Sequence, residues 1–151
     1  MRFGFGHPDF STDSAFFTLL NGSFARFVGT SLVPPDCDAD WLYNEAPFAV
    51  LAHNTEPDPV FIYANRSAQN CFGYSWEEFT SLPSRLSAEA PDRAERQTLL
   101  DAVARSGFTS DYRGLRIAKS GRRFWIERAT VWQLMDGEGV VHGQAATFAL
   151  P

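Results

Sequence analysis

Histidines are the side chains of this sequence best suited to acid–base catalysis or metal binding. The chain has three, His7, His53 and His142, among 151 residues. None forms a metal-binding pair with a second ligand on a predicted helix, and no histidine falls in the long helix expected after residue 92. The spacing therefore predicts structural or surface histidines, and it favours neither a metal site nor a haem ligand.

Paired carboxylates and nucleophiles give an equally weak indication of catalysis. Glu56 and Asp58 lie two residues apart in a proline-rich turn, where solvated carboxylates are expected and general acid–base catalysis is not. Ser87 lies in no nucleophile motif, and the sequence contains no phosphate-binding or dinucleotide-binding fingerprint. Cys37 and Cys71 form no metal-binding pattern. We therefore predict a protein that binds without catalysing a reaction.

Composition and charge limit the classes of partner that the protein is expected to bind. The formal net charge is -5 and the pI is about 5.1. A negatively charged protein repels the phosphate backbone of nucleic acids, so we expect no nucleic-acid binding. No apolar run approaches the ~20 residues of a membrane span, and the first residues lack a signal-peptide pattern. With two ordinary thiols, these features predict a cytoplasmic protein without a membrane segment.

Apolar residues at helical spacing predict an N-terminal helix over residues 12–28, with Ser11 as N-cap and Gly29 as its end. Pro34 and Pro35 break any helix that follows. We therefore assign residues 1–40 to a helix and linker, and residues 41–151 to the main domain. The apolar stripe of the helix consists of Phe16, Leu20, Phe24 and Phe27.

The main domain is predicted to be α+β. Two strands, over residues 48–53 and 60–64, are expected to form a hairpin, and three later strands an antiparallel meander. The later strands are expected over residues 112–118, 124–134 and 140–150. Between the two groups, the capping spacings Ser75–Glu78 and Asp92–Glu95 predict helix starts, and Gly107 predicts the end of the longer helix.

Several motifs resemble the PAS domain family. The resemblance is carried by residues 58–65 (DPVFIYAN), by Ala68, by residues 73–79 (GYSWEEF) and by the turns at residues 120–125 and 136–139. Residues 46–54, 82–89, 129–132 and 143–148 are more specifically similar to the MEKHLA domain, a PAS-like group. The resemblance implies a five-stranded antiparallel sheet with helices on one face, plus an N-terminal helix. It also implies a cavity that can bind a cofactor or metabolite.

The resemblance leaves the cofactor unknown. Haem-binding PAS domains need a histidine in the long helix, and this chain has none there. Photosensory flavin domains carry their reactive cysteine in a later helix, whereas Cys71 precedes Phe72-Gly73-Tyr74 in the first core helix. We therefore expect neither haem nor a covalent flavin adduct. Gln144 is similar in position to the flavin-facing glutamine of those photosensors.

Strand alternation and helical spacing predict which side chains face the cavity. The residues expected there are Tyr63, Leu99, Val103, Ile126, Gln144 and Phe148. Arg128 is a further candidate because it shares the alternation of Ile126. An inward Arg128 would need an anionic partner, and the alternative is a solvent-exposed Arg128 at the edge of the sheet.

Three functions are consistent with these features. The first is a stand-alone PAS-like sensory and signalling domain that binds a small molecule or a protein partner. The second is an interaction or homodimerisation module with a filled core, which pairs through an exposed stripe on the N-terminal helix. The third, least favoured, is a small cavity enzyme, which would need His142 in a pocket with Glu127 or Asp111.

Overall fold

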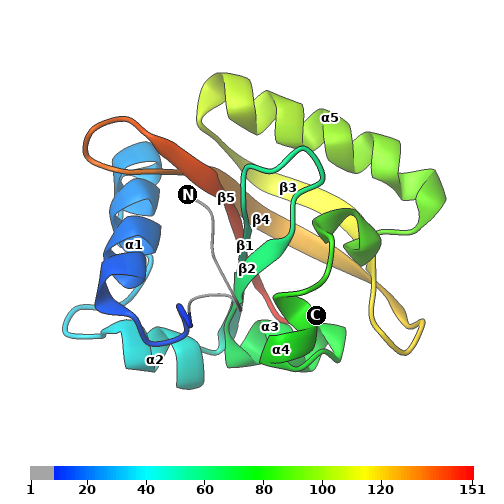
Figure 1. The fold of residues 1–151 in the computed structure, drawn as a ribbon, viewed down its shortest axis with the longest axis horizontal. Coiled ribbons are helices and arrows are strands. Elements are labelled where there is room, and N and C mark those ends of the chain that lie inside the picture. The colour runs from blue at the N-terminus through cyan, green and yellow to red at the C-terminus, as the bar shows by residue number, and fades with distance from the viewer. Residues whose placement is uncertain (1–8) are drawn as a thin grey trace.

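The structure is a computed structural model that describes residues 9–151, arranged as one sheet with helices on both faces (Figure 1). His7, expected to be structural or at the surface, lies outside the described residues. The sheet has five strands in the order β2-β1-β5-β4-β3, and every neighbouring pair is antiparallel. The strands are β1 (Phe48–His53), β2 (Phe61–Ala64), β3 (Phe108–Ile117), β4 (Arg123–Met135) and β5 (Val141–Ala149). The predicted α+β class, hairpin and meander are confirmed.

One face of the sheet is covered by three short helical elements and one long helix. These are α3 (Arg66–Phe72), α4 (Trp76–Phe79), the 3-10 turn η1 (Ser84–Ser87) and α5 (Ala90–Ser106). Their apolar side chains form one core with the sheet, in which Phe72, Phe79 and Val103 are almost completely buried. Burial of each such side chain stabilises the fold by roughly 1.5–3 kcal/mol.

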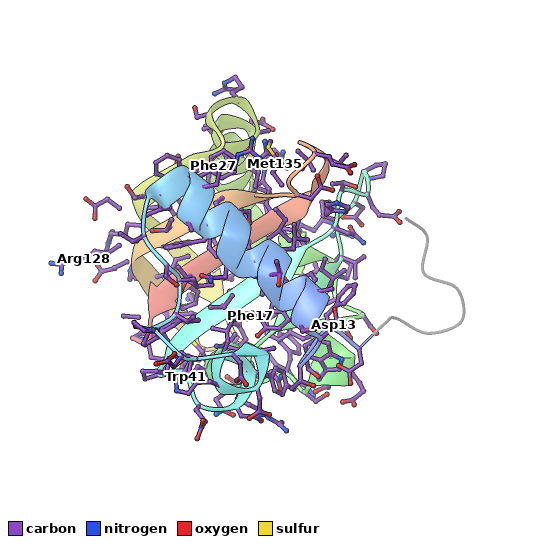
Figure 2. All side chains as sticks on the ribbon, turned by 90° about the vertical axis from the view of Figure 1, so that its left-hand side faces the viewer. Asp13, Phe17, Phe27, Trp41, Arg128 and Met135 are labelled. Carbon is purple, nitrogen blue, oxygen red and sulfur yellow. The ribbon has the colours of Figure 1, made fainter. Side chains whose placement is uncertain are left out.

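The opposite face is covered by α1 (Ser14–Val28), with α2 (Ala39–Asn44) beside its N-terminal end (Figure 2). The stripe of α1 packs on the sheet: Phe16, Leu20 and Phe24 are buried. The Trp132 indole N–H donates to the buried Ser23 hydroxyl at 3.0 Å. The stripe therefore faces the sheet, whereas the predicted pairing through this helix requires an exposed stripe.

Helix starts follow the side chains that can accept the free backbone N–H groups. At α4, Ser75 and Glu78 form the predicted capping box. At α1 the cap is Asp13, which accepts from the Phe16 N–H at 2.8 Å, so the prediction of Ser11 is wrong. The Ser11 hydroxyl instead donates to the Asp9 carboxylate.

The helix α5 begins at Ala90, before the Asp92–Glu95 pair predicted to open it. Pro91 occupies its first turn, where a backbone N–H has no acceptor within the helix, so the N–H that proline lacks costs no hydrogen bond. Glu95 therefore does not cap α5, and its carboxylate accepts a hydrogen bond from the Tyr112 hydroxyl at 2.9 Å.

Asn65 joins the two layers at the edge of the hairpin. Its side-chain oxygen caps α3 by accepting from the Ala68 N–H, and it also accepts from the Val50 N–H, each at 3.0 Å. Its amide donates to the carbonyls of Leu42 and Phe48. The predicted cap is confirmed, and the same side chain also connects α2, β1 and α3.

Candidate functional site

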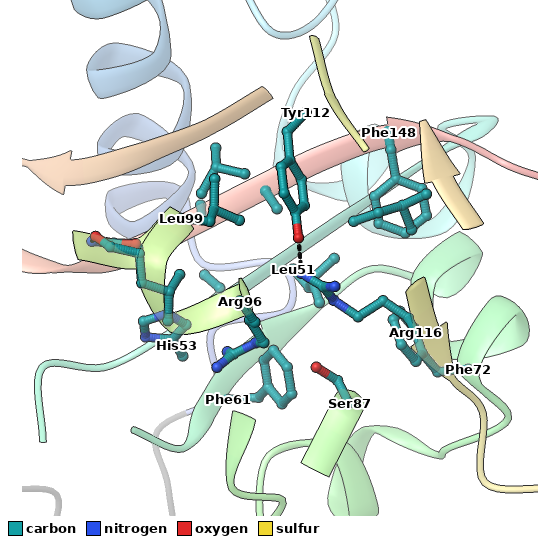
Figure 3. Close-up of a pocket in the computed structure, with 17 residues that line it drawn as sticks. Leu51, His53, Phe61, Phe72, Ser87, Arg96, Leu99, Tyr112, Arg116 and Phe148 are labelled. Atoms are coloured by element: carbon teal, nitrogen blue, oxygen red, sulfur yellow. Dashed lines mark hydrogen bonds between the residues drawn. The ribbon is translucent and has the colours of Figure 1, made fainter. Parts of the chain in front are cut away.

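A cavity of about 50 Å³ lies between α5 and the sheet (Figure 3). At 10–15 Å³ per water position, it has room for roughly three to five water molecules. Most of its lining is apolar, and the larger apolar side chains are Leu51, Phe61, Phe72, Leu99, Leu100, Ile126, Val131 and Phe148. A cavity of this size and lining suits the apolar part of a small molecule.

Four of the seven residues predicted to face this cavity line it. They are Leu99 on α5, Ile126 on β4, and Gln144 and Phe148 on β5. Val103 lies in the same core and is completely buried, but it does not line the cavity. Alternation along β5 and the helical face of α5 therefore place these side chains as expected.

Tyr63 lies on the other face of the sheet, so its predicted place in the cavity is wrong. The pairing of β2 with β1 shifts at this point: Tyr63 opposes Ala52, but Phe61 opposes His53. The extra residue, Ile62, is a bulge that reverses the alternation. Phe61 consequently faces the cavity, while Tyr63 packs against Phe16 of α1.

Arg128 is exposed, so the solvent-exposed alternative is the correct one (Figure 2). Gly114 of β3 pairs with Ile126, and Tyr112 pairs with Ala129. Two steps along β3 therefore correspond to three along β4, which leaves one extra residue in β4. Arg128 takes a φ of 53° in this bulge. Its side chain points away from the protein, and Ala129 returns to the buried face.

Two other arginines line the cavity, and the structure buries both. Arg96 on α5 and Arg116 on β3 are each 6% exposed. Arg96 donates to the Ser84 hydroxyl at 2.8 Å, and Arg116 donates to the Tyr112 hydroxyl at 3.0 Å. In Figure 3 the Arg116 guanidinium meets the Tyr112 hydroxyl, and the Arg96 guanidinium is drawn between His53 and Phe61.

Neither buried guanidinium has an acidic partner. Among residues 9–151, no carboxylate oxygen lies within 4.0 Å of Arg96 or Arg116. The nearest compensation is indirect, because Arg116 reaches the Glu95 carboxylate only through the Tyr112 hydroxyl. Burial, together with the charge of Arg116, lowers the pKa of Arg96 from 12.5 to about 10. Arg96 therefore remains charged at neutral pH in surroundings that penalise the charge.

A glycine makes room for this arrangement on β3. A Cβ at Gly114 would lie 2.2 Å from the Tyr112 hydroxyl oxygen and 2.7 Å from Nη1 of Arg116. Both side chains occupy the space over Gly114, since residues two apart on a strand share a face. Gly114 thus allows the tyrosine and arginine to meet.

His53, at the end of β1, also lines the cavity and is 9% exposed. Its Nδ1 lies 2.9 Å from the Asn54 carbonyl oxygen, which fixes the proton on Nδ1. Burial and, to a smaller extent, the nearby charge of Arg96 together lower the pKa of His53 from 6.5 to about 4. The imidazole is therefore neutral at physiological pH, with Nε2 as an acceptor.

Sequence reasoning missed Arg96, Arg116 and His53, although spacing signals for the arginines were present. Arg96 lies three residues before Leu99, hence on the same helical face. Arg116 lies two residues after Gly114, on one face of β3. The arginines were missed because charged side chains are normally placed in solvent.

The arrangement required by the enzyme hypothesis is absent from residues 9–151. His142 is exposed and pairs with Asp136 at 2.9 Å. Glu127 instead pairs with Arg113 at 2.8 Å. Within the same residues, no group of three His, Cys, Asp or Glu side chains could hold a metal ion, and no helix is long and apolar enough to cross a membrane.

The family model of the MEKHLA domain matches residues 14–150. The chain belongs to the MEKHLA domain family. The match includes α1 and so spans the proposed boundary at residue 40. No curated protein sequence matches this MEKHLA domain significantly.

Solved structures share its fold at low sequence identity. A light-oxygen-voltage domain studied with a flavin analogue has a TM-score of 0.56 and 21% identity, covering 66% of this chain and 73% of that one. A PAS domain from Colwellia psychrerythraea has a TM-score of 0.58 and 18% identity, with 70% and 86% covered. An RNA-binding light-oxygen-voltage receptor has a TM-score of 0.60 and 23% identity, covering 78% of this chain but only 36% of the receptor. This MEKHLA domain therefore has the PAS fold.

Proposed function

We propose that this MEKHLA domain is a sensory module that binds a small organic anion in the cavity between α5 and the sheet, without catalysing a reaction. The observation that carries the proposal is the pair of buried guanidinium groups without a carboxylate partner. A buried charge is strongly unfavourable unless an opposite charge compensates it. An anionic ligand supplies that charge, and guanidinium groups bind carboxylates through paired hydrogen bonds.

The rest of the lining supports a ligand with a compact apolar body. Phe61, Phe72 and Phe148 surround the cavity with aromatic rings, which favour planar apolar groups. Drug-sized ligands and cofactors occupy pockets of roughly 300–1,000 Å³. The cavity of about 50 Å³ adjoins a groove of about 250 Å³ at His53, Leu100 and Gln144, which favours a small acid whose ring extends from the cavity into the groove.

Binding at this position gives the domain a means of reporting the ligand. Arg96 lies on α5 and Arg116 on β3, so an anion between them connects the helix to the edge of the sheet. It also removes the repulsion between the two like charges. We infer that occupancy stabilises the docking of α5, which a protein partner can then read.

The direct test is calorimetric titration of benzoate, the simplest aromatic carboxylate, into the wild-type protein and two variants. Arg96→Met and Arg116→Met are each expected to weaken binding at least ~30-fold, because loss of one partner from a buried charge pair costs about 2 kcal/mol or more. Arg128→Met is the matched control, since Arg128 is exposed, and it should leave the affinity unchanged. Equal benzoate affinity in all four proteins would contradict the proposal.

A second candidate function is an interaction module with a filled core. The small cavity favours it, as does the exposed Trp125 ring on β4, which is 45% exposed and covered on one side by Arg113 with its guanidinium carbon 3.6 Å from the ring centre. Such a module would bind no benzoate at millimolar concentration. Replacement of Trp125 would then disrupt its association with a partner protein.

A further inference from the structure

Two buried acceptor atoms at the cavity lack any hydrogen bond among residues 9–151. They are Nε2 of His53 and Oε1 of Gln144. The two residues are cross-strand partners on β1 and β5, and each is 9% exposed. An unsatisfied buried polar atom carries a desolvation penalty, so such an atom in a folded protein normally has a hydrogen-bond partner, and at a binding site the ligand can be that partner.

The hydrogen bonds on the other sides of these groups fix both atoms as acceptors. The Gln144 amide nitrogen donates to the Leu100 carbonyl at 3.1 Å. An amide group turned by 180° would instead place its oxygen against that carbonyl oxygen, so Oε1 stays an acceptor that faces the cavity. The Asn54 carbonyl beside Nδ1 holds the His53 proton there in the same way. Protonation of Nε2 is unfavourable, because burial lowers the pKa of His53 to about 4.

The wall of the cavity carries both hydrogen-bond donors and hydrogen-bond acceptors. The guanidinium groups of Arg96 and Arg116 offer donors, and His53 and Gln144 offer acceptors, in a lining that is otherwise mostly apolar. His53, Gln144 and Leu100 also line a groove of about 250 Å³ on the adjoining surface. The acceptors therefore lie on the side of the cavity that adjoins the groove.

We propose that the ligand of this cavity is a small organic acid that also carries an N–H or O–H donor, which His53 and Gln144 bind while Arg96 and Arg116 bind its anionic group. This inference rests on the proposed function, because it concerns the same cavity. It narrows the ligand class to hydroxy acids and amino-substituted acids. A simple carboxylate would leave both acceptors unsatisfied.

Matched probes separate the donor from every other property of the ligand. The 3- and 4-hydroxybenzoates are each titrated beside the corresponding fluorobenzoate, which has the same carboxylate and nearly the same size but no donor. At least one hydroxybenzoate should bind about tenfold more tightly than its fluoro analogue, since a buried hydrogen bond contributes roughly that factor. Equal affinities within both pairs would overturn the inference.

Variants at the acceptors give a second readout. Gln144→Leu and His53→Phe should each reduce the preference for the hydroxyl to about threefold or less, while the affinity for the fluoro analogue stays within twofold of wild type. Gln133→Leu is the control, because Gln133 is the neighbour of Gln144 on β4 and does not line the cavity. An unchanged hydroxyl preference in both acceptor variants would also overturn the inference.

The outcomes distinguish this inference from the proposed function. Fluorobenzoate binding that requires Arg96, without a preference for the hydroxyl, retains the anion site and rejects the donor. If neither fluorobenzoates nor hydroxybenzoates bind, both proposals are wrong. A hydroxyl preference that disappears in Gln144→Leu supports both.

Discussion

Replacing Arg96 by methionine should stabilise the protein when no ligand is bound. The guanidinium is 6% exposed, and its pKa falls from 12.5 to about 10 in the folded state. Because one pKa unit corresponds to about 1.4 kcal/mol, the folded state carries a penalty of ~3 kcal/mol for this charge. The penalty applies throughout the neutral range, since both pKa values lie well above pH 7.

One smaller effect opposes the gain. The hydrogen bond from Arg96 to the Ser84 hydroxyl is lost, which costs ~1 kcal/mol. The apolar stem of the side chain is largely retained in methionine. We therefore expect Arg96→Met to raise the free energy of unfolding by ~2 kcal/mol, as replacement of poorly compensated buried charges by apolar groups does elsewhere.

Urea denaturation at pH 7 measures this change, using protein refolded from urea to remove any bound molecule. With a typical slope of ~2 kcal/mol per molar urea, the midpoint should rise by ~1 M at an unchanged slope. Arg128→Met, at an exposed position, should leave the midpoint within ~0.3 M. A loss of more than ~1 kcal/mol in Arg96→Met would refute the reasoning, because it would mean that the folded protein satisfies this guanidinium by itself.

Three further results are expected. Stability should fall by up to ~3 kcal/mol as the pH decreases from about 6.5 to about 4, because the unfolded chain takes up a proton that buried His53 does not. His53→Phe should remove this part of the dependence in urea melts at pH 7 and 4.5, leaving the contribution of exposed carboxylates such as Glu78, whose pKa is lowered by Lys119; a dependence as steep as that of the wild type would contradict the assignment. Leu20→Ala should cost ~2–5 kcal/mol in the same assay, because Leu20 is fully buried between α1 and the sheet, whereas a change below 0.5 kcal/mol would show that α1 does not dock there. Asn65→Ala should cost at least ~3 kcal/mol, since Asn65 is fully buried and makes four hydrogen bonds; a loss under 1 kcal/mol would argue against this network.

Local signals predicted the fold well because they act over a few residues. Asn65 and the Ser75–Glu78 pair each satisfy free N–H groups of the next helix, and the sequence spacing alone reveals them. The Asp92–Glu95 pair has the same spacing but does not cap, because Pro91 is accommodated in the first turn of α5. Competing signals within one turn therefore limit how accurately helix ends can be predicted.

The cavity was predicted less completely because strand alternation fails at bulges. One extra residue at Ile62 moved Tyr63 to the α1 face, and one in β4 moved Arg128 into solvent. Neither bulge is marked by a glycine in the bulged strand. Leu99 and Phe148 were placed correctly because α5 and the paired part of β5 keep regular periodicity.

The most direct test of the anion site observes the guanidinium groups themselves. In nitrogen-15 NMR spectra of the wild-type protein, the Nε–H signals of Arg96 and Arg116 can be assigned from the spectra of Arg96→Met and Arg116→Met and followed during titration with 4-hydroxybenzoate. We expect both signals to shift and saturate with one common dissociation constant, while the signal of exposed Arg128 stays in place. Shifts confined to exposed arginines, or no saturable shift at Arg96 and Arg116, would contradict an anion site in this cavity.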